Sequence, residues 1–229
     1  MCIRDSNTNP TIVSKPDPRY LFTQALANFD GHDYFAWYYD YNNMLRWSQT
    51  VASTGGNENL MTTMSNSGKM GSQVYNVMNQ VNELTYIVNT TLEGEEQAKY
   101  TYLKALCQPL MIYLAMWDTD MYGSMAYTEA YQARYGGTLT PKYDTQAELF
   151  DLWEKQLKET VETLANDVTI DGNKVTQQSL GSQDIIYQGD YTKWLKFANS
   201  LRLKLAVRLI NEDKDLSLIH ISEPTRRSY

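Results

Sequence analysis

The sequence predicts an all-α fold in which pairs of helices stack side by side and long polar loops join them. Six stretches of the chain carry apolar residues at helical spacing. Four of them follow one another as two pairs, and the one strand signal is a short hairpin. The six stretches are 19–29, 33–50, 69–89, 95–118, 145–165 and 190–210.

The first part of the chain predicts two helices between irregular segments. Residues 7–18 are polar and contain three prolines, which favours an extended lead-in. A short helix is expected over 19–29. The stretch 33–50 is aromatic nearly all round, so we expect a helix that packs on more than one side. Residues 53–67 are rich in Gly, Asn, Ser and Thr and predict a loop.

The first predicted pair consists of the stretches 69–89 and 95–118. The short turn at 91–94 makes these two helices antiparallel neighbours. Pro109 lies inside the second stretch. Because proline lacks a backbone N–H, we expect a kink near Ala105.

The second predicted pair begins with a capping box. Thr145 is followed three residues later by Glu148, which is the pattern of two side chains that satisfy each other's backbone N–H groups. The helix is expected to run to about Ala165. Residues 166–188 then predict a long polar loop with a small hairpin around Asp171-Gly172.

The second helix of this pair covers 190–210, with Asp190 at its N-cap. Three cations, Arg202, Lys204 and Arg208, lie in the last turns, where they suit the helix dipole. Pairs of this size stack in tetratricopeptide-like solenoids, although the usual repeat consensus is absent. The apolar stripe is Trp194, Phe197, Ala198, Leu201, Leu205 and Leu209.

The two ends of the chain are interpreted as products of a DNA artefact. Codons that can encode residues 1–6 are the reverse complement of codons that can encode 216–221, so both ends fit one inverted element that looks like a sequencing adapter. We therefore exclude 1–6 and 216–229 from fold reasoning. Residues 7–215 are then expected to form an incomplete helical domain, cut from a longer chain.

Composition and charge exclude several classes of function. The formal net charge of −7 argues against a nucleic-acid partner, because phosphate neutralisation needs clustered Lys and Arg. No stretch approaches the roughly 20 apolar residues of a membrane span. The 18 Tyr and 5 Trp residues suit cores, interfaces and sugar-stacking surfaces alike.

Three blocks of sequence resemble a known family. They are WDTDMYGSMAYTEA at 117–130, TPKYDTQAEL at 140–149 and DIIYQGDYTKWLKFANSLRLKLAVRL at 184–209. In order and spacing they resemble the SusD/RagB-like family, and within it the SusD-like nutrient-binding subgroup. One departure is Met125-Ala126, where the family usually has Ile-Pro, and this puts the shape of that loop in doubt.

The resemblance implies a SusD-like fold of tetratricopeptide-like helix pairs and a non-catalytic function. It implies a surface-exposed lipoprotein of the outer membrane, whose lipid anchor and signal peptide are missing from this chain. Such a protein holds an oligosaccharide or peptide and delivers it to a SusC-like TonB-dependent transporter. The resemblance implies no cofactor. In the family, the helix pairs largely face the transporter, and much of the ligand surface comes from loops and the later half of the chain.

Four aromatic residues of the 33–50 stretch are the candidate ligand-binding residues: Trp37, Tyr39, Tyr41 and Trp47. Their rings could stack on the apolar faces of a sugar while tyrosine hydroxyls bond to it. The alternative interpretation is that the same rings form the packed core of a helix.

Other residue patterns give no catalytic or metal site. Asp118 and Asp120 could form an acid pair for glycoside hydrolysis or bind Ca²⁺, but capping of a helix end is the simpler interpretation. His32 has no Cys or His partner at metal-ligand spacing. Cys107 lies inside an apolar helix and is expected to be a small buried hydrophobe. No nucleophile motif or phosphate-binding loop is found.

Two functions other than nutrient binding are therefore left open by the sequence. One is a helical-repeat scaffold that binds protein partners and no small ligand. The other is a helical glycoside hydrolase that uses Asp118 and Asp120.

Overall fold

The computed structural model of the chain describes residues 17–29, 44–52 and 72–210. These ranges are mainly helical, which confirms the predicted all-α class. The elements are α1 (Pro18–Ala27), α3 (Leu45–Trp47), α4 (Ser72–Thr91), α5 (Gly94–Ala98), α6 (Thr101–Tyr122), the 3-10 helix η3 (Ala133–Tyr135), α7 (Gln146–Ala165), β1 (Thr169–Ile170), β2 (Asn173–Lys174), the 3-10 helix η4 (Gly181–Gln183) and α8 (Tyr191–Arg208).

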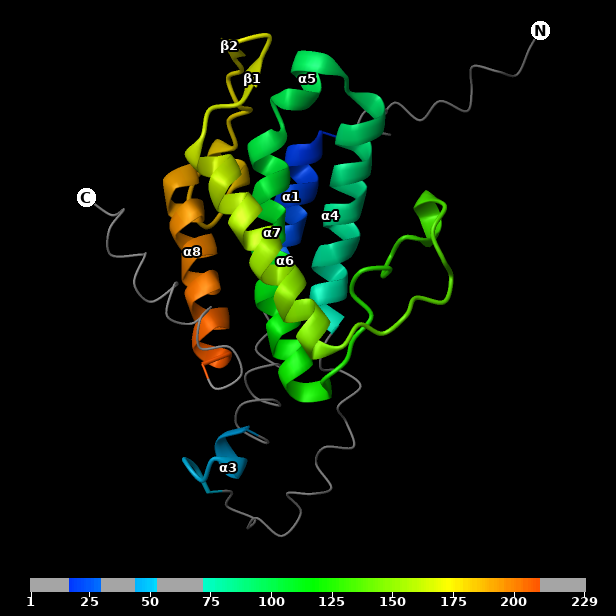
Figure 1. Cartoon of the computed structure of the whole chain (residues 1–229), viewed down its shortest axis with the longest axis vertical. Coiled ribbons are helices and arrows are strands. Elements are labelled where there is room, and N and C mark those ends of the chain that lie inside the picture. Colours follow the sequence, from blue (N-terminus) through cyan, green and yellow to red (C-terminus); the bar gives the residue numbers. More distant parts are fainter. Residues whose placement is uncertain (1–16, 30–43, 53–71, 211–229) are drawn as a thin grey trace, which may run out of the picture.

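The helices α1, α4, α6, α7 and α8 lie side by side, and α4, α6, α7 and α8 run alternately up and down (Figure 1). Helix α4 packs on α6, and α7 packs on α8, as the sequence predicted. Contact between α6 and α7 joins the two pairs, and α1 covers α4. This is the stacked-pair arrangement of a tetratricopeptide-like solenoid.

Helix α1 begins where two N-terminal signals coincide. The carboxylate of Asp17 accepts a hydrogen bond from the backbone N–H of Arg19 at 2.9 Å, and Pro18 occupies the first helical position. The apolar face of α1 carries Phe22 and Leu26 into the core, where both are buried. The predicted helix over 19–29 is therefore confirmed, but it begins one residue earlier and ends at Ala27.

The prediction of one helix over 95–118 is wrong, because the chain breaks into α5 and α6 at residues 99–100. The side chain of Gln177 bridges the break. Its Oε1 accepts from the N–H of Tyr102 at 3.0 Å, and its Nε2 donates to the carbonyl oxygen of Ala98 at 3.0 Å. A loop residue far along the sequence thus satisfies the backbone groups that the break exposes.

Helix α6 contains Pro109 and continues on both sides of it. The proline leaves the carbonyl oxygen of Ala105 without its helical N–H donor. The hydroxyl of Thr160, on α7, lies 3.4 Å from that oxygen and donates to it. Two residues before Pro109 on the same helix, Cys107 is fully buried, as predicted, and burial raises the pKa of its thiol to about 12.

Helix α7 and the hairpin that follows it confirm two local predictions. The hydroxyl of Thr145 accepts from the N–H of Glu148 at 3.3 Å, and the Glu148 carboxylate accepts from the Thr145 N–H at 2.9 Å. Strands β1 and β2 pair antiparallel across Asp171 and Gly172. Both turn residues have positive φ, 51° and 80°, which is the geometry of a tight two-residue hairpin turn.

Helix α8 is capped by Asp190, which accepts from two N–H groups of the first turn. Two of its predicted dipole-stabilising cations, Arg202 and Arg208, form ion pairs with side chains of neighbouring helices. Arg202 forms a two-pronged contact with Glu154 of α7, with a closest distance of 2.6 Å. Arg208 pairs with Asp120 of α6. These ion pairs fix α8 against both earlier helices.

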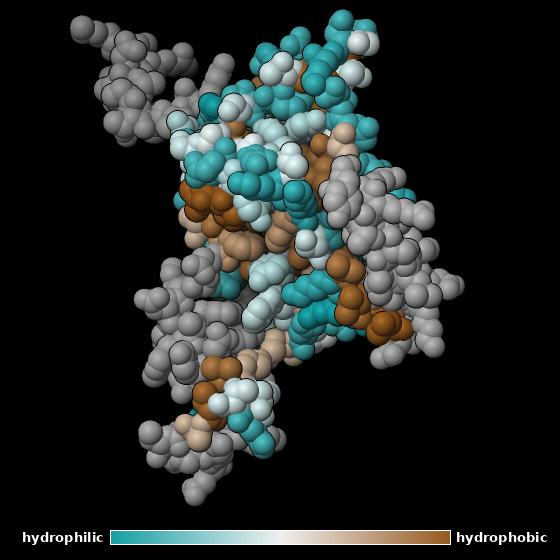
Figure 2. Space-filling model, turned by 90° about the vertical axis from the view of Figure 1, so that its left-hand side faces the viewer, coloured by the Kyte–Doolittle hydropathy of each residue, from teal (hydrophilic) through white to brown (hydrophobic). Residues whose placement is uncertain are grey.

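The face on the α8 side of the bundle is shown in Figure 2. It is hydrophilic at the end that carries the hairpin and has hydrophobic patches lower down. Exposed apolar side chains at the two ends of α8 include Ile185, Ile186, Val207 and Ile210. None of the described helices is both long enough and apolar enough to cross a membrane.

Candidate functional site

The predicted aromatic platform lies mostly beyond the described residues. Trp37, Tyr39 and Tyr41 fall in the range 30–43, outside them, and so does His32. Trp47 is in the short helix α3 and is 40% exposed. Figure 1 shows α3 beyond the lower ends of the long helices. The proposed role of these four aromatic residues therefore stays a prediction.

The two acids that could have formed a catalytic pair point in different directions. Asp120 pairs with Arg208 of α8. Asp118 lies two positions earlier on α6, and side chains at that spacing do not face each other. Burial raises the pKa of Asp118 to about 7, and its charge acts on Tyr75 of α4. The geometry of a two-carboxylate glycosidase site is thus not formed by this pair.

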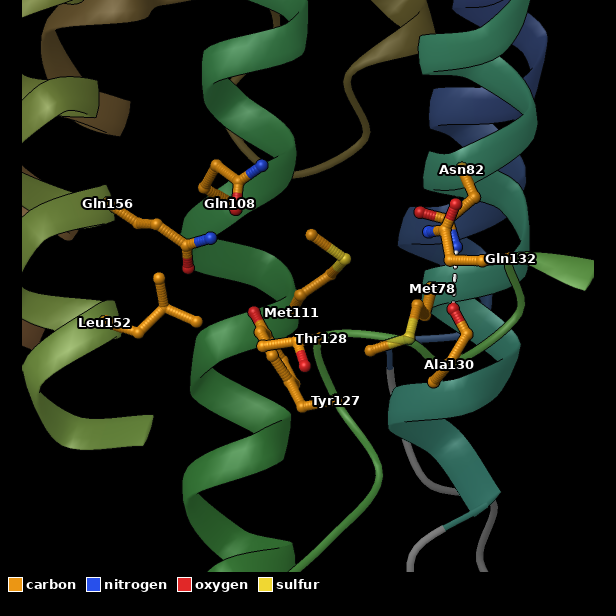
Figure 3. Close-up of a pocket in the computed structure, with 10 residues that line it drawn as sticks. All are labelled: Met78, Asn82, Gln108, Met111, Tyr127, Thr128, Ala130, Gln132, Leu152 and Gln156. Carbon is orange, nitrogen blue, oxygen red and sulfur yellow. Dashed lines mark hydrogen bonds between the residues drawn. The ribbon is translucent and has the colours of Figure 1, made fainter. Parts of the chain in front are cut away.

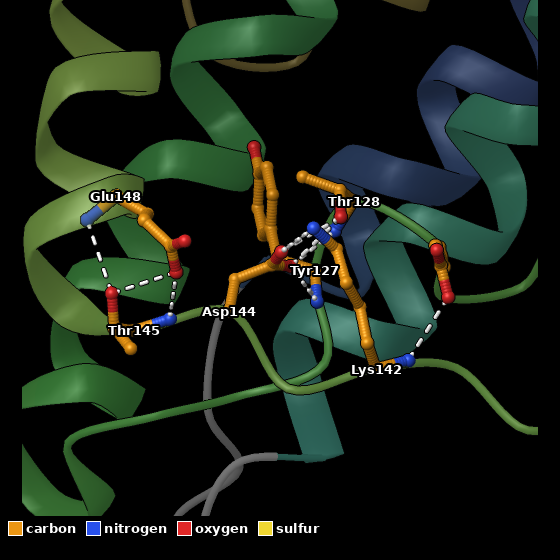
Figure 4. Close-up of polar contacts among 7 residues, drawn as sticks. Tyr127, Thr128, Lys142, Asp144, Thr145 and Glu148 are labelled. Atoms are coloured by element: carbon orange, nitrogen blue, oxygen red, sulfur yellow. Dashed lines mark hydrogen bonds and ion pairs between the residues drawn. The ribbon is translucent and has the colours of Figure 1, made fainter.

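A buried carboxylate anchors the loop between α6 and α7 (Figure 4). Asp144 is 2% exposed and accepts from the N–H groups of Tyr127 at 3.1 Å and Thr128 at 2.8 Å, and from the Thr128 hydroxyl at 2.8 Å. Lys142 lies 3.3 Å from the same carboxylate. Burial acts to raise the pKa of Asp144, but these hydrogen bonds outweigh it, and the pKa is lowered.

A second buried carboxylate anchors the turn before α8. Asp184 is fully buried and accepts from the N–H groups of Ile186 at 3.0 Å, Tyr187 at 3.0 Å and Gly189 at 2.9 Å. The indole N–H of Trp194 donates to it at 2.7 Å. Asp144 and Asp184 belong to the sequence blocks that resembled a family. Their function in the structure is to hold loops in place.

A pocket of about 280 Å³ opens between α4, α6, α7 and residues 127–132 (Figure 3). Its lining combines four amide side chains, two hydroxyl groups and several apolar groups, and it includes no charged residue. A neutral polar pocket of this kind suits a neutral ligand with hydrogen-bonding groups. The lining residues are Met78, Asn82, Gln108, Met111, Tyr127, Thr128, Ala130, Gln132, Leu152 and Gln156.

Two amide oxygens of this lining, the Oε1 atoms of Gln108 and Gln156, are closed to solvent and have no hydrogen-bond partner within the described part of the chain. Figure 3 shows Gln108 on α6 and Gln156 on α7, with the Gln156 amide directed toward α6. They also line a second pocket of about 280 Å³ along the α6–α7 groove, beside Ala105 and Thr160. The two amides therefore lie where the two pockets meet.

The phenol of Tyr127 is buried, with 7% of the residue exposed. Burial raises the pKa of this phenol, and a hydrogen bond with Trp153 lowers it by a smaller amount. The two rings meet edge to face with centroids 5.5 Å apart. The Tyr127 hydroxyl is thus enclosed beside the Trp153 indole and is not open to the pocket.

A strained residue shapes the pocket wall. Tyr131 has a φ of 57°, a left-handed conformation that is costly for a tyrosine. Its neighbours Ala130 and Gln132 line the pocket. Its own ring is 47% exposed and stacks on Tyr75 of α4, with centroids 6.0 Å apart. Gly137 packs closely against the same wall. Any larger residue there would clash with it, because a Cβ atom would lie 2.5 Å from Gln132 Cβ.

Sequence reasoning missed the residues of this pocket. One signal was present: Gln108 is a polar residue inside the apolar run Leu106–Met111 of a buried helix. Gln156 carried no such signal, because it stands among the charged residues Glu154, Lys155 and Lys158. Tyr127 could not be identified from the sequence either, because its position in the pocket depends on a loop that the Asp144 contacts hold in place.

The fold and the pocket together define an all-α protein of stacked helix pairs with a pocket lined by neutral polar and apolar side chains. The chain belongs to the SusD-like family described as starch-binding and associating with the outer membrane, which matches residues 10–224. A comparison with curated proteins finds no match.

Solved structures of SusD homologues share this fold. One from Parabacteroides distasonis is 20% identical with a TM-score of 0.66 and matches 90% of this chain. A SusD/RagB family protein from Bacteroides thetaiotaomicron is 19% identical with a TM-score of 0.55 over 89% of this chain. A homologue from Bacteroides vulgatus is 26% identical with a TM-score of 0.52 over 69%. This chain spans 38%, 40% and 29% of their respective lengths.

Proposed function

We propose that the chain is part of a non-catalytic nutrient-binding protein of an outer-membrane uptake system. It captures an oligosaccharide or a peptide and delivers it to a SusC-like TonB-dependent transporter. The observation that carries this proposal is the family match over residues 10–224, which includes all the described helices. Because the chain spans two fifths or less of its solved relatives, the whole protein's ligand and partner belong to the proposal.

The surface of the described helices and loops supports a binding function. Exposed aromatic side chains occur on α4, near the end of α6 and on the loop that follows it. Such rings present apolar faces flanked by hydroxyl groups, which is a chemistry that suits sugars. They are Tyr86, Trp117, Tyr122, Tyr131 and Tyr143, whose exposed fractions range from 39% to 72%.

The proposed location is the outer surface of the outer membrane, through a lipid on an N-terminal cysteine of the longer protein. The family description, which includes association with the outer membrane, supports this location. The proposal includes the expectation that residues 7–215 are native and that the two ends of the chain derive from an adapter.

Affinity capture tests the function in two steps. The full-length parent protein, recovered by sequencing across both ends of the source DNA, is expressed with an affinity tag in its native membrane. Recovery of a TonB-dependent transporter with it is the expected result, and recovery of none would contradict the transport role. A glycan and peptide panel is then applied to the same protein. Failure of every ligand on the panel would favour a protein-binding scaffold instead.

A further inference from the structure

We infer that the loop segment 129–142 is a movable flap over the pocket between α4, α6 and α7, kept closed by a latch between Tyr135 and Glu83 of α4. The inference concerns a movement built into the fold. It holds whatever molecule the pocket admits, so it goes beyond the proposed function and does not rest on it. Its basis is a segment that is fixed at its base, packs on α4 through a few surface contacts and forms part of the pocket wall.

The two ends of the flap are fixed to each other. Just outside it, the backbone groups of Met125 and Asp144 exchange two hydrogen bonds, of 3.1 Å and 2.9 Å. At its base, the N–H of Lys142 donates to the Glu129 carboxylate at 3.0 Å. A compact loop whose ends are held together in this way is able to move as a unit while the helices on either side of it stay in place.

The flap contributes little to the hydrophobic core. Ala130 belongs to the core, but residues 131–142 are all half-buried or exposed. Segments with few buried apolar contacts open locally at a free energy well below that of global unfolding. The flap can therefore leave α4 while the bundle stays folded.

The latch is a small set of contacts between the flap and one face of α4. The Tyr135 hydroxyl donates to Glu83 Oε2 at 2.6 Å, and the rings of Tyr135 and Tyr86 have centroids 4.8 Å apart. Arg134 pairs with the same carboxylate at 3.2 Å. Burial and the bond to Glu83 raise the pKa of Tyr135 to about 12, so the phenol keeps its proton at neutral pH. Because these groups are half-buried or exposed, water can replace each contact, and the latch is reversible.

The flap also forms one wall of the pocket. Ala130 and Gln132 line it beside Met78 and Asn82 of α4, and the Asn82 amide donates to the Ala130 carbonyl oxygen at 3.3 Å (Figure 3). Between them, Tyr131 has the strained φ of 57°. Such strain persists only where the surrounding contacts hold it, so it favours opening. Opening removes Ala130 and Gln132 from the wall and gives solvent access to Met78.

Two measurements on the 229-residue chain test the flap. Amide hydrogen exchange, followed by mass spectrometry, reports the opening of residues 129–142. Oxidation by dilute hydrogen peroxide reports access to the pocket through Met78 and Met111, which line it and are buried. Met116 on α6 is fully buried and outside the lining, so its oxidation reports global unfolding.

Tyr135→Phe removes the latch hydroxyl and keeps the ring. It should speed both exchange in the flap and oxidation of Met78 and Met111 about fivefold, the equivalent of one net hydrogen bond, and leave Met116 unchanged. Glu83→Gln keeps an acceptor for the hydroxyl but removes the charge that pairs with Arg134. It should change the same rates in the same direction by a smaller factor.

Tyr102→Phe is the matched control. It also removes a phenol hydroxyl, which donates to the carbonyl oxygen of Asn166 at 2.8 Å, outside the flap and its latch. It should change neither the exchange of residues 129–142 nor the oxidation of the pocket methionines. An effect on either rate as large as that of Tyr135→Phe would contradict the assignment of the latch.

Three further results would overturn the inference. Faster exchange in the flap with unchanged oxidation of Met78 would show that the segment does not close the pocket. No change in either rate would show that the contact between Tyr135 and Glu83 is not a latch. Faster oxidation of Met116 in both Tyr135→Phe and Glu83→Gln would show that these contacts stabilise the whole bundle. None of these measurements uses a ligand, so the proposed function is tested separately.

Discussion

The indole N–H of Trp194 donates to the carboxylate of Asp184 at 2.7 Å, and both residues are fully buried. The bond joins the turn before α8 to the first apolar position of α8. Trp194 also contacts Phe22 of α1, with ring centroids 5.9 Å apart. One residue pair therefore connects a loop, the last helix and the first helix. In the sequence the two residues are ten positions apart, within the block that resembles the family.

Replacement of Asp184 by Ala should destabilise the protein by roughly 3–5 kcal/mol. The change leaves the indole N–H and three backbone N–H groups without their acceptor in a buried site. Urea unfolding monitored by tryptophan fluorescence measures the loss. The matched control is Asp190→Ala, which removes an exposed N-cap of the same helix and should cost about 1 kcal/mol. Equal effects of the two variants would contradict the structural role of Asp184.

Local signals were enough to predict most of the helices. Asp190 begins α8 and Thr145 begins α7 because each cap needs only residues within one turn. The break between α5 and α6 could not be predicted in this way. It depends on Gln177, a residue 75 positions from its partner Tyr102, and no periodic pattern records such a contact.

The candidate site was less predictable for the same reason. The sequence singled out aromatic residues at 37–47, whereas the pocket is lined by two glutamines from facing helices and a loop tyrosine. Gln108 and Gln156 are 48 residues apart and meet only because α6 packs on α7. A polar residue inside an apolar helix marks a candidate, but its partner is known only once the helices are placed.

The hydroxyl of Thr160 should matter because Pro109 is present. Thr160→Val removes the donor to the Ala105 carbonyl oxygen, which has no helical N–H partner, and should cost about 1 kcal/mol. The single proton of this hydroxyl is shared with the Gln156 carbonyl oxygen, which lies closer at 3.0 Å, so part of the cost is independent of the proline.

A double-mutant cycle separates the two parts. In a Pro109→Ala background, the alanine N–H is able to satisfy the Ala105 carbonyl, so Thr160→Val should cost measurably less than in the parent. The free energies of unfolding of the four proteins give the coupling. Strict additivity would show that the Thr160 contact does not compensate for the proline.

Asp144 should make the protein less stable in acid. The hydrogen bonds from Tyr127 and Thr128 lower its pKa in the folded state relative to about 3.9 in the unfolded chain. Its contribution is therefore complete above about pH 4 and is lost as the pH falls through the folded-state pKa. Asp144→Asn should flatten this part of the stability curve.

A milder variant tests the cause of that shift. Thr128→Val removes the hydroxyl donor at 2.8 Å but keeps the carboxylate and both backbone N–H donors. It should move the acid loss of stability to higher pH without abolishing it. An unchanged midpoint in a pH series of urea unfolding curves would mean that the hydroxyl does not stabilise the ionised form.

Asp118 should have the opposite effect on stability, making the protein less stable at neutral pH than in acid. Burial raises its pKa to about 7 in the folded state, while the unfolded chain keeps about 3.9. Between these two values the folded state binds the proton more tightly, so stability is greatest at the acid end and falls as the pH rises to about 7. Above that pH the folded protein holds a partly buried charge, and its stability no longer falls because of Asp118.

Asp118→Asn removes this pH-dependent loss because the amide is neutral throughout. The variant should be more stable than the parent at about pH 8 by at least about 1 kcal/mol, the equivalent of one pKa unit, and the difference should shrink toward about pH 4. Asp120, two positions after Asp118, serves as the control. Asp120→Asn disrupts the ion pair with Arg208 and should instead cost no more than about 1 kcal/mol. If Asp118→Asn destabilises the protein at about pH 8, the carboxylate is stabilised by a partner in its ionised form, and the burial argument is wrong.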